Sequence, residues 1–172
     1  MVRGGNVMDN YIVINGKKAE LTDEQLKKLG IKVEKETPFP KRINNGLYYY
    51  ITARGIIESE TEEGNCIDTG LYNNANYFND KSFAQQVAWH EELNRRLLKY
   101  AYNHKTIVDD WSDPNSNKYF ITKNTVDNKF YVSLNNVLKH SCVIYFTSGK
   151  AAEQAIEDVV KPFMKEHPEF VW

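Results

Sequence analysis

A pattern that occurs twice constrains this sequence more than any other feature. Tyr49-Tyr-Ile-Thr52 returns 70 residues later as Tyr119-Phe-Ile-Thr122, and Tyr77-Phe78 returns 68 residues later as Tyr145-Phe146. Each Tyr-Phe pair precedes a polar turn and then a segment in which apolar residues recur at helical spacing. Short β-rich runs that recur at nearly the same offset indicate a duplicated unit. We therefore expect two βββα units, each a short antiparallel sheet packed by a helix.

Turns and caps set the limits of the first unit. A strand over 47–51 is followed by a second strand after the turn near Gly55 and by a third that ends at Tyr77-Phe78. A cap at Asn79 or Asp80 then predicts a long helix to about residue 103.

The second unit has the matching order. Its first strand starts near Lys118, its third ends at Tyr145-Phe146, and its helix is capped at Thr147 or Ser148. We expect Pro162 to interrupt that helix, because proline lacks the backbone N–H that a helix interior needs and its ring clashes with the preceding turn.

A smaller unit precedes both. An Asn15-Gly16 pair separates Tyr11-Ile-Val-Ile14 from Lys17–Glu20, which is a strong signal for a β-hairpin. Thr22-Asp-Glu-Gln25 predicts a capping box at the start of a helix, and Gly30 is placed to end that helix in a left-handed conformation.

The predicted fold is therefore α+β: a small β-hairpin plus helix, followed by the duplicated βββα units. Segments rich in Pro and in Asn-Gly separate these parts. The expected divisions are 1–36 for the hairpin-helix unit, 37–46 for a linker, 47–104 for the first βββα unit, 105–117 for a spacer and 118–172 for the second βββα unit.

Side chains alternate between the two faces of a strand, which divides the residues of each unit into two sets. The set expected to face the helix and the core is Tyr49, Ile51, Tyr119 and Ile121. The set expected on the opposite face is Tyr48, Tyr50, Lys118 and Phe120. If that face is open, its aromatic side chains form a binding surface. If a second layer or the other copy covers it, they belong to the core.

Composition and charge exclude several classes of protein. The chain carries 22 Lys+Arg against 23 Asp+Glu, a formal net charge of −1, and no segment is a basic arm. This balance is not typical of a general nucleic-acid binder. No apolar run reaches the roughly 20 residues that a membrane-spanning helix needs, so we expect no membrane association. Asn, Lys, Ile and Tyr, all encoded by A/T-rich codons, are abundant, which indicates a low-GC bacterium or its phage.

The two cysteines indicate a reducing compartment. Cys66 and Cys142 stand far apart in the sequence, whereas a secreted disulfide scaffold carries more cysteines in a shorter chain. We expect two free and mostly buried thiols, in a protein of the bacterial host cytoplasm.

The common signatures of catalysis and metal binding are absent or broken. Asn94 stands where a second histidine would have to follow His90 in a zinc-protease helix, and Ser148-Gly149-Lys150 lacks the earlier glycine of a phosphate-binding loop. Cys66 and Cys142 lie in strand-like runs rather than at a helix N-terminus, where a thiol is activated. We therefore predict a non-enzymatic protein with no catalytic residues, no metal site and no cofactor.

The first βββα unit carries an acidic run. Its members are Glu58, Glu60, Glu62 and Glu63. Carboxylates grouped in this way are attracted to lysines and arginines that are placed to bind phosphates. The run is either a surface that competes for a nucleic-acid groove on a partner or an ordinary solvated loop.

Four blocks of sequence resemble a group of small accessory proteins from phages and prophages of low-GC Gram-positive bacteria. The blocks are Ile14-Asn-Gly-Lys with Glu20-Leu-Thr and its helix, Gly46-Leu-Tyr-Tyr-Tyr-Ile, Asn76-Tyr-Phe and its helix, and Lys118-Tyr-Phe-Ile with Ile144-Tyr-Phe-Thr-Ser. The resemblance implies a phage origin. It does not extend to the segment after Val160, where Pro162 and Trp172 depart from the pattern of the group.

A phage accessory protein without an active site acts by binding. The leading hypothesis is that this protein inhibits a bacterial defence system by binding one of its proteins stoichiometrically. The first candidate for the target is a CRISPR effector nuclease or its ribonucleoprotein complex. The residues predicted to contact this partner are Glu58, Glu60, Glu62, Glu63, Tyr48, Tyr50 and Phe120.

Two alternatives remain open. One is a nucleic-acid-binding accessory protein for phage replication or recombination, which would stack bases on those aromatic residues and use Arg54, Lys118 and Lys123 for charge. The other is a sponge for a nucleotide second messenger, which would need a deep pocket with convergent polar groups.

Overall fold

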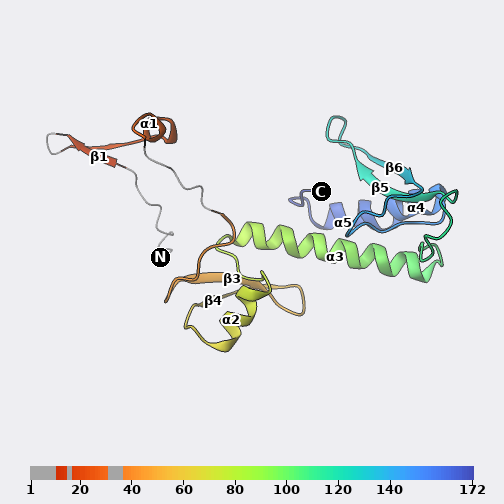
Figure 1. The fold of residues 1–172 in the computed structure, drawn as a ribbon, viewed down its shortest axis with the longest axis horizontal. Coiled ribbons are helices and arrows are strands. Elements are labelled where there is room, and N and C mark those ends of the chain that lie inside the picture. The colour runs from red at the N-terminus through yellow and green to blue at the C-terminus, as the bar shows by residue number, and fades with distance from the viewer. Residues whose placement is uncertain (1–10, 15–16, 31–36) are drawn as a thin grey trace. The chain divides into compact units, whose positions relative to one another are not determined.

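The protein has two compact units, Met1–Thr37 and Pro38–Trp172, in a computed structural model that describes residues 11–14, 17–30 and 37–172 (Figure 1). The fold is α+β, as predicted. Within the described residues, every sheet is an antiparallel pair of consecutive strands. None of the helices described is both long and apolar enough to cross a membrane.

The first unit begins with the predicted hairpin. β1 (Tyr11–Ile14) pairs antiparallel with β2 (Lys17–Glu20). The pairing confirms the hairpin, whereas the turn predicted at Asn15-Gly16 lies outside the described residues.

The helix of the first unit also starts and ends as predicted. α1 (Asp23–Lys28) begins at a capping box in which the Thr22 N–H donates to Gln25 Oε1 at 2.8 Å and the Gln25 N–H donates to Thr22 Oγ1 at 3.3 Å. Gly30 follows the helix with φ +73°, the left-handed conformation that glycine adopts without strain.

The second unit contains two hairpins, one long helix and a C-terminal helical segment (Figure 1). Its elements are β3 (Leu47–Ile51), β4 (Ile57–Thr61), α2 (Cys66–Asn73), α3 (Lys81–Asn103), β5 (Lys118–Lys123), β6 (Phe130–Asn135), α4 (Gly149–Ala155), a π-helical turn (Ile156–Val160) and α5 (Lys161–Glu166).

In the segment over residues 47–104, which we call the first repeat, β3 and β4 form a hairpin. Tyr49 and Phe78 exchange two backbone hydrogen bonds at 2.7 and 2.8 Å across the outer edge of β3. The predicted third strand at Tyr77-Phe78 is therefore wrong, because this single bridge takes its place. The chain cannot continue along β3, since Asp80 already caps helix α3 two residues after the bridge.

The segment over residues 118–172, which we call the second repeat, has a similar hairpin and bridge. β5 and β6 form a hairpin, and Tyr119 and Phe146 exchange two backbone hydrogen bonds at 3.0 and 2.7 Å. Its third strand is likewise reduced to the single residue Phe146, which also bridges to Ile107, because the chain turns at Thr147 into the Ser148 cap of α4. Each repeat thus has a hairpin, a bridge to its first strand and a following helix rather than the three strands of a βββα unit, and the first repeat has α2 in addition.

Helix α2 is an element that the sequence analysis missed. Asn65 caps it through Oδ1, which accepts from the N–H groups of Ile67 and Asp68, while Asp68 accepts from the Asn65 N–H. The prediction that Cys66 lies in a strand-like run is wrong, since it is the first residue of α2. Cys66 and Cys142 are both free thiols, and both are exposed rather than buried as expected.

Helix α3 packs against both repeats. It begins at the Asp80 cap and ends at Asn103, as predicted. Near its start, Phe83 packs against Phe78 of the first repeat, with ring centroids 5.9 Å apart. Its later turns enter the core of the second repeat. The buried residues of this core are Leu93, Leu97, Ala101, Phe146, Ala152, Ala155, Val160, Phe163 and Phe170.

For Tyr48 and Lys118, the structure decides between the open and the covered face that the sequence left as alternatives. Tyr119 and Ile121 of β5 pack against the core, as expected. Tyr48 is fully buried, so the interpretation that it lies on an open face is wrong. The Tyr77 ring stacks on the Tyr48 ring with centroids 4.0 Å apart, and the Tyr48 hydroxyl donates to Asp68 of α2. Helix α2, which the sequence did not predict, therefore belongs to a second layer over this face. Lys118, at the matching position of β5, is buried as well.

The last helix does not stop at Pro162. The π-helical turn widens the backbone there, and the Lys161 N–H reaches back five residues to the Ile156 carbonyl. Pro162 then occupies the first turn of α5, where a missing N–H costs little. The helical segment therefore continues to Glu166, and the prediction of an interruption is wrong.

Candidate functional site

The acidic run of the first repeat divides into exposed and buried carboxylates. Glu58 and Glu60 project from β4, opposite Tyr50 and Tyr48, and both are exposed. Glu63, in the turn after β4, is exposed as well. We call Glu58, Glu60 and Glu63 the acidic hairpin surface. Side chains two residues apart on a strand lie on the same face, about 6.8 Å apart, so Glu58 and Glu60 point the same way.

Two of these exposed carboxylates carry uncompensated charge. Glu58 accepts a hydrogen bond from the Tyr50 hydroxyl at 2.9 Å and lies 4.0 Å from the Arg54 guanidinium. Glu60 and Glu63 have no ion-pair partner in the part of the chain that the structure describes. The acidic hairpin surface therefore presents net negative charge to solvent.

Glu62 has a structural role instead. It is 2% exposed and forms a two-pronged ion pair with Arg42, from Nη2 to Oε1 at 2.6 Å and from Nε to Oε2 at 2.8 Å. The Arg42 hydrogen bonds hold the pKa of the Glu62 carboxyl below its usual value. This pair and its burial set Glu62 apart from the exposed glutamates with which it was predicted to contact a partner.

Asp68 anchors the segment that follows β4. Its carboxylate is fully buried and accepts from the Tyr48 hydroxyl at 2.7 Å and from the N–H groups of Glu63 and Asn65 at 2.9 and 3.2 Å. The Tyr48 hydrogen bond, helped by the backbone donors, lowers the pKa of Asp68, while burial and Asp68 raise the pKa of Tyr48. This carboxylate therefore fixes the turn that displays Glu63.

Arg42 and Tyr77 complete this buried cluster. Arg42 Nη1 also donates to Thr69 Oγ1 of α2 at 3.0 Å, which joins the segment before β3 to the helix after β4. Burial and the neighbouring Glu62 raise the pKa of Tyr77 to about 12, so its hydroxyl stays protonated. Sequence analysis missed Arg42 and Asp68. The Asn65-x-x-Asp68 spacing of a capping box was the signal that could have identified Asp68.

The remaining aromatic candidates lie in separate hairpins. Tyr50 is half-buried on β3. Phe120 is half-buried on β5, where its ring lies 5.3 Å from Tyr145 and 6.1 Å from His140. Lys118 is 1% exposed and its ammonium donates to the carbonyls of Asp113 and Asn136. With Tyr48 and Lys118 both buried, the residues that would bind nucleic acid do not share one surface.

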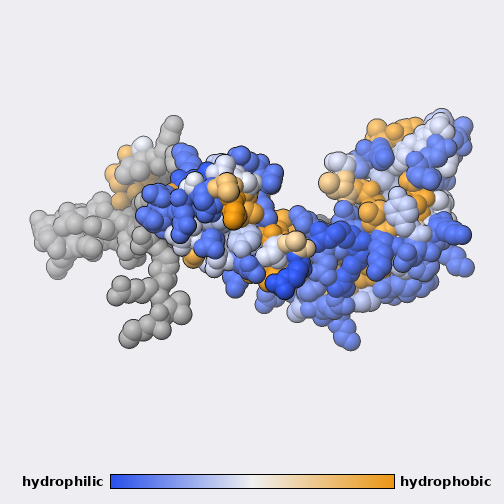
Figure 2. Space-filling model, turned by 90° about the horizontal axis from the view of Figure 1, so that it is seen from below, coloured by the Kyte–Doolittle hydropathy of each residue, from blue (hydrophilic) through white to orange (hydrophobic). Residues whose placement is uncertain are grey.

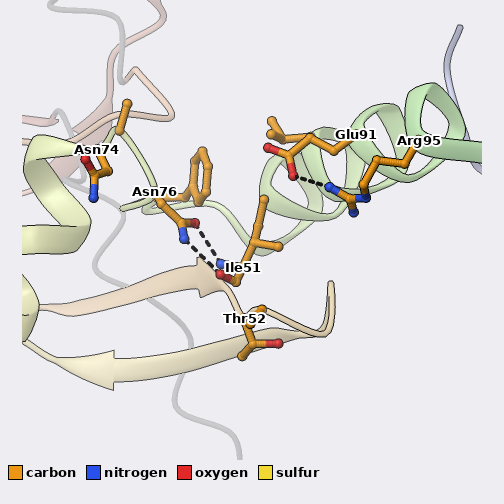
Figure 3. Close-up of a pocket in the computed structure, with 10 residues that line it drawn as sticks. Ile51, Thr52, Asn74, Asn76, Glu91 and Arg95 are labelled. Carbon is orange, nitrogen blue, oxygen red and sulfur yellow. Dashed lines mark hydrogen bonds and ion pairs between the residues drawn. The ribbon is translucent and has the colours of Figure 1, made fainter. Parts of the chain in front are cut away.

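A small polar cavity lies beside β3 in the first repeat (Figure 3). Its volume is about 280 Å³, and Asn76 and Thr52 line it together with Glu91 and Arg95 of α3. Glu91 and Arg95 form an ion pair at 3.2 Å, and the Asn76 amide is bound to the backbone of Ile51. Each of these four side chains therefore has a partner within the protein, since Thr52 Oγ1 accepts from the Ile56 N–H. The volume lies below the roughly 300–1,000 Å³ typical of ligand sites.

The lowered pKa values of Asp68 and Glu62 predict a loss of stability in acid. In the folded chain, Asp68 and Glu62 take up protons less readily than in the unfolded chain. Their carboxyl groups titrate near the ordinary pKa values of 3.8 and 4.5 when the chain is unfolded. The stabilising contribution is therefore complete above these values and is lost as the pH falls through the lower folded values. Thermal unfolding followed by circular dichroism should show Tm falling below about pH 4.5. In the variant D68N/E62Q this fall should be smaller, and an unchanged fall would contradict the assignment.

The structure thus brings three of the predicted residues, Glu58, Glu60 and Glu63, together on one exposed segment. It buries Glu62 and Tyr48 beneath them and leaves Tyr50 and Phe120 half-buried. Among the described residues, no group of three or more His, Cys, Asp or Glu side chains is placed to hold a metal ion. No protein-family model, curated protein or solved structure matches the chain.

Proposed function

We propose that this protein is a phage-encoded, non-enzymatic inhibitor that binds a protein of a bacterial defence system through the acidic hairpin surface. The observation that supports this function is the display of Glu58, Glu60 and Glu63 above a buried, hydrogen-bonded cluster. The complementary surface on a partner is a groove of lysines and arginines that otherwise bind phosphates. A CRISPR effector nuclease in the host cytoplasm presents such a groove to its guide and target strands.

Rigidity is what distinguishes this surface from a solvated loop. Glu58 and Glu60 stand on a paired strand, and the Glu63 N–H is bound by the buried Asp68 carboxylate. A backbone segment that is already held in place loses less conformational entropy when it binds. The acidic hairpin surface can therefore compete for a basic groove at a smaller entropic cost than a flexible acidic loop.

The two alternatives have less support from the geometry. Exposed carboxylates repel a nucleic-acid backbone, and two of the residues assigned to that role, Tyr48 and Lys118, are buried. A second-messenger sponge calls for a deep pocket with free polar groups, whereas Asn76, Glu91 and Arg95 of the cavity beside β3 are already paired.

We also infer that the two repeats arose by duplication of one unit. The matching bridges, Tyr49 with Phe78 and Tyr119 with Phe146, support this origin, as do the two buried side chains at matching strand positions, Tyr48 and Lys118. The acidic hairpin surface has no counterpart on β6, where the sequence is Phe-Tyr-Val-Ser-Leu-Asn. The proposed interface is therefore a property of the first repeat alone.

The function is tested by affinity capture from a nuclease-treated lysate of a low-GC Gram-positive host that carries several defence systems. The expected result is one effector nuclease at near-equal stoichiometry, whose activity falls on addition of the protein. The variant E58K/E60K/E63K should bind it at least tenfold more weakly. The matched control, E24K/D109K/E153K, changes the same number of exposed charges elsewhere and should bind normally.

Two results would overturn the proposal. One is capture that appears only when the nuclease treatment is omitted, which would favour the nucleic-acid alternative. The other is equal binding by the two triple variants, which would show that the acidic hairpin surface does not contact the partner.

A further inference from the structure

The two repeats differ at one position of their otherwise matching edges. In the first repeat, the Asn76 side chain acts as a substitute for a third strand. Its Oδ1 accepts from the Ile51 N–H and its Nδ2 donates to the Ile51 carbonyl, both at 2.8 Å (Figure 3). One amide therefore satisfies the backbone of β3 next to the Tyr49–Phe78 bridge.

In the second repeat, this amide is missing. Ile144 occupies the position that matches Asn76, 68 residues later, and an isoleucine side chain cannot pair with a backbone. Residues two apart on a strand turn their N–H and C=O groups to the same edge, so Ile121 faces the edge at which Tyr119 binds Phe146. Over residues 37–172, no group pairs with the Ile121 backbone at this edge.

An apolar cavity adjoins this open edge. Its volume is about 230 Å³. Its lining is mainly apolar, with Leu93, Leu97, Ile121, Val143, Ile144, Phe146 and Trp172, and the polar residues His90 and Asn94 of α3 also line it. This cavity lies between β5, residues 142–146 and α3, just as the polar cavity of the first repeat lies between β3, residues 74–78 and α3. Its lining is mainly apolar, whereas that of the first cavity is mainly polar. Figure 2 shows that hydrophobic atoms reach the surface in several separate patches of a largely hydrophilic face.

We propose that this edge of β5 binds an extended segment of another protein by strand addition. The main chain of the segment would pair with the N–H and C=O of Ile121, as the Asn76 amide does with Ile51, and one of its aliphatic side chains would enter the cavity. This inference concerns a different surface from the acidic hairpin and does not depend on the proposed function.

Charge indicates what else the segment carries. No Asp or Glu side chain is among the residues that line the cavity. Lys123 stands two residues beyond Ile121 on the same edge, with its ammonium 5.7 Å from the Phe130 ring centroid. Opposite charges across neighbouring strands stabilise the pairing. The fitting partner is therefore an extended aliphatic segment with an acidic residue beside the side chain that enters the cavity.

The two exposed cysteines supply a direct test. Cys142 lines the apolar cavity, whereas Cys66 begins α2 in the first repeat. The probe is the blocked peptide acetyl-Thr-Val-Leu-Val-Asp-amide, and the readout is the rate at which iodoacetamide alkylates each thiol, measured by mass spectrometry of the folded chain. The peptide should slow alkylation of Cys142 at least fivefold and leave Cys66 unchanged.

Three controls separate strand addition from simple apolar binding. The same peptide methylated on its backbone nitrogens has no main-chain donors and should give no protection. The variant I144N restores the amide of the first repeat and should close the edge to the peptide. The variant K123E, at a strand end, should weaken protection without affecting the core.

The proposal is overturned if the methylated peptide protects Cys142 as well as the parent peptide does, or if saturating peptide protects neither thiol. It is also overturned if Cys142 is protected without peptide in proportion to protein concentration, because a second copy of the chain would then occupy the edge. Loss of folding in I144N would leave K123E and the methylated peptide to decide.

Discussion

Replacement of Asp68 by alanine is expected to lower the melting temperature by on the order of 10 °C. The change leaves three donors without their acceptor: the buried Tyr48 hydroxyl and the partly buried N–H groups of Glu63 and Asn65. It also removes half of the capping box of α2. Thermal unfolding at neutral pH measures the effect. The matched control E60A removes an exposed carboxylate from the same repeat and should change Tm by less than about 2 °C.

The contribution of the Tyr48 hydroxyl can be separated from that of the other donors to Asp68. Y48F removes one donor and keeps the ring stacked on Tyr77, so it should cost less than D68A. Combined with D68A it should add little, because the hydroxyl has already lost its acceptor. Additive effects of the two changes would show that this hydrogen bond does not stabilise the fold.

Truncation of either bridge phenylalanine should have the largest effect on stability. Phe78 is 1% exposed and Phe146 is fully buried. F78A and F146A should each lower the free energy of unfolding by about 3–5 kcal/mol, because each leaves a cavity where a hairpin meets α3. Urea unfolding followed by tryptophan fluorescence measures the loss. V126A, at a side chain 93% exposed, is the control and should stay within about 0.5 kcal/mol of the parent.

The two truncations also test whether the repeats are equivalent. Losses of similar size are expected, since both phenylalanine rings are almost completely buried. A loss confined to one variant would mean that only that ring contributes to cooperative folding.

The helix caps and the first hairpin could be predicted because their signals are local in the sequence. The capping box at Thr22, the Asp80 cap of α3 and the Ser148 cap of α4 each depend on residues within one turn, and all are present. The pairing of β1 with β2 likewise follows from a short loop. The third strands were wrong because a bridge of one residue pair has the same local sequence as the end of a strand.

The errors at the candidate site have a different cause. Burial of Tyr48 and Glu62 is decided by Asp68 and Arg42, each 20 residues away in the sequence. Strand alternation correctly placed Tyr48 on the face away from α3, but alternation alone does not indicate whether a second layer covers that face. Once α2 is recognised from its Asn65 cap, the acidic run separates into the one glutamate that pairs with Arg42 and the three that remain exposed.

The shared position of α3 has a consequence for how the chain can be divided. The helix follows the first repeat in sequence, yet its buried residues Leu93, Leu97 and Ala101 belong to the core of the second. A fragment that ends at Asn103 would expose these residues to water, and a fragment that begins at His104 would lack them altogether. Neither cut yields two fragments that each keep a complete core. We therefore expect the two repeats to fold and unfold together.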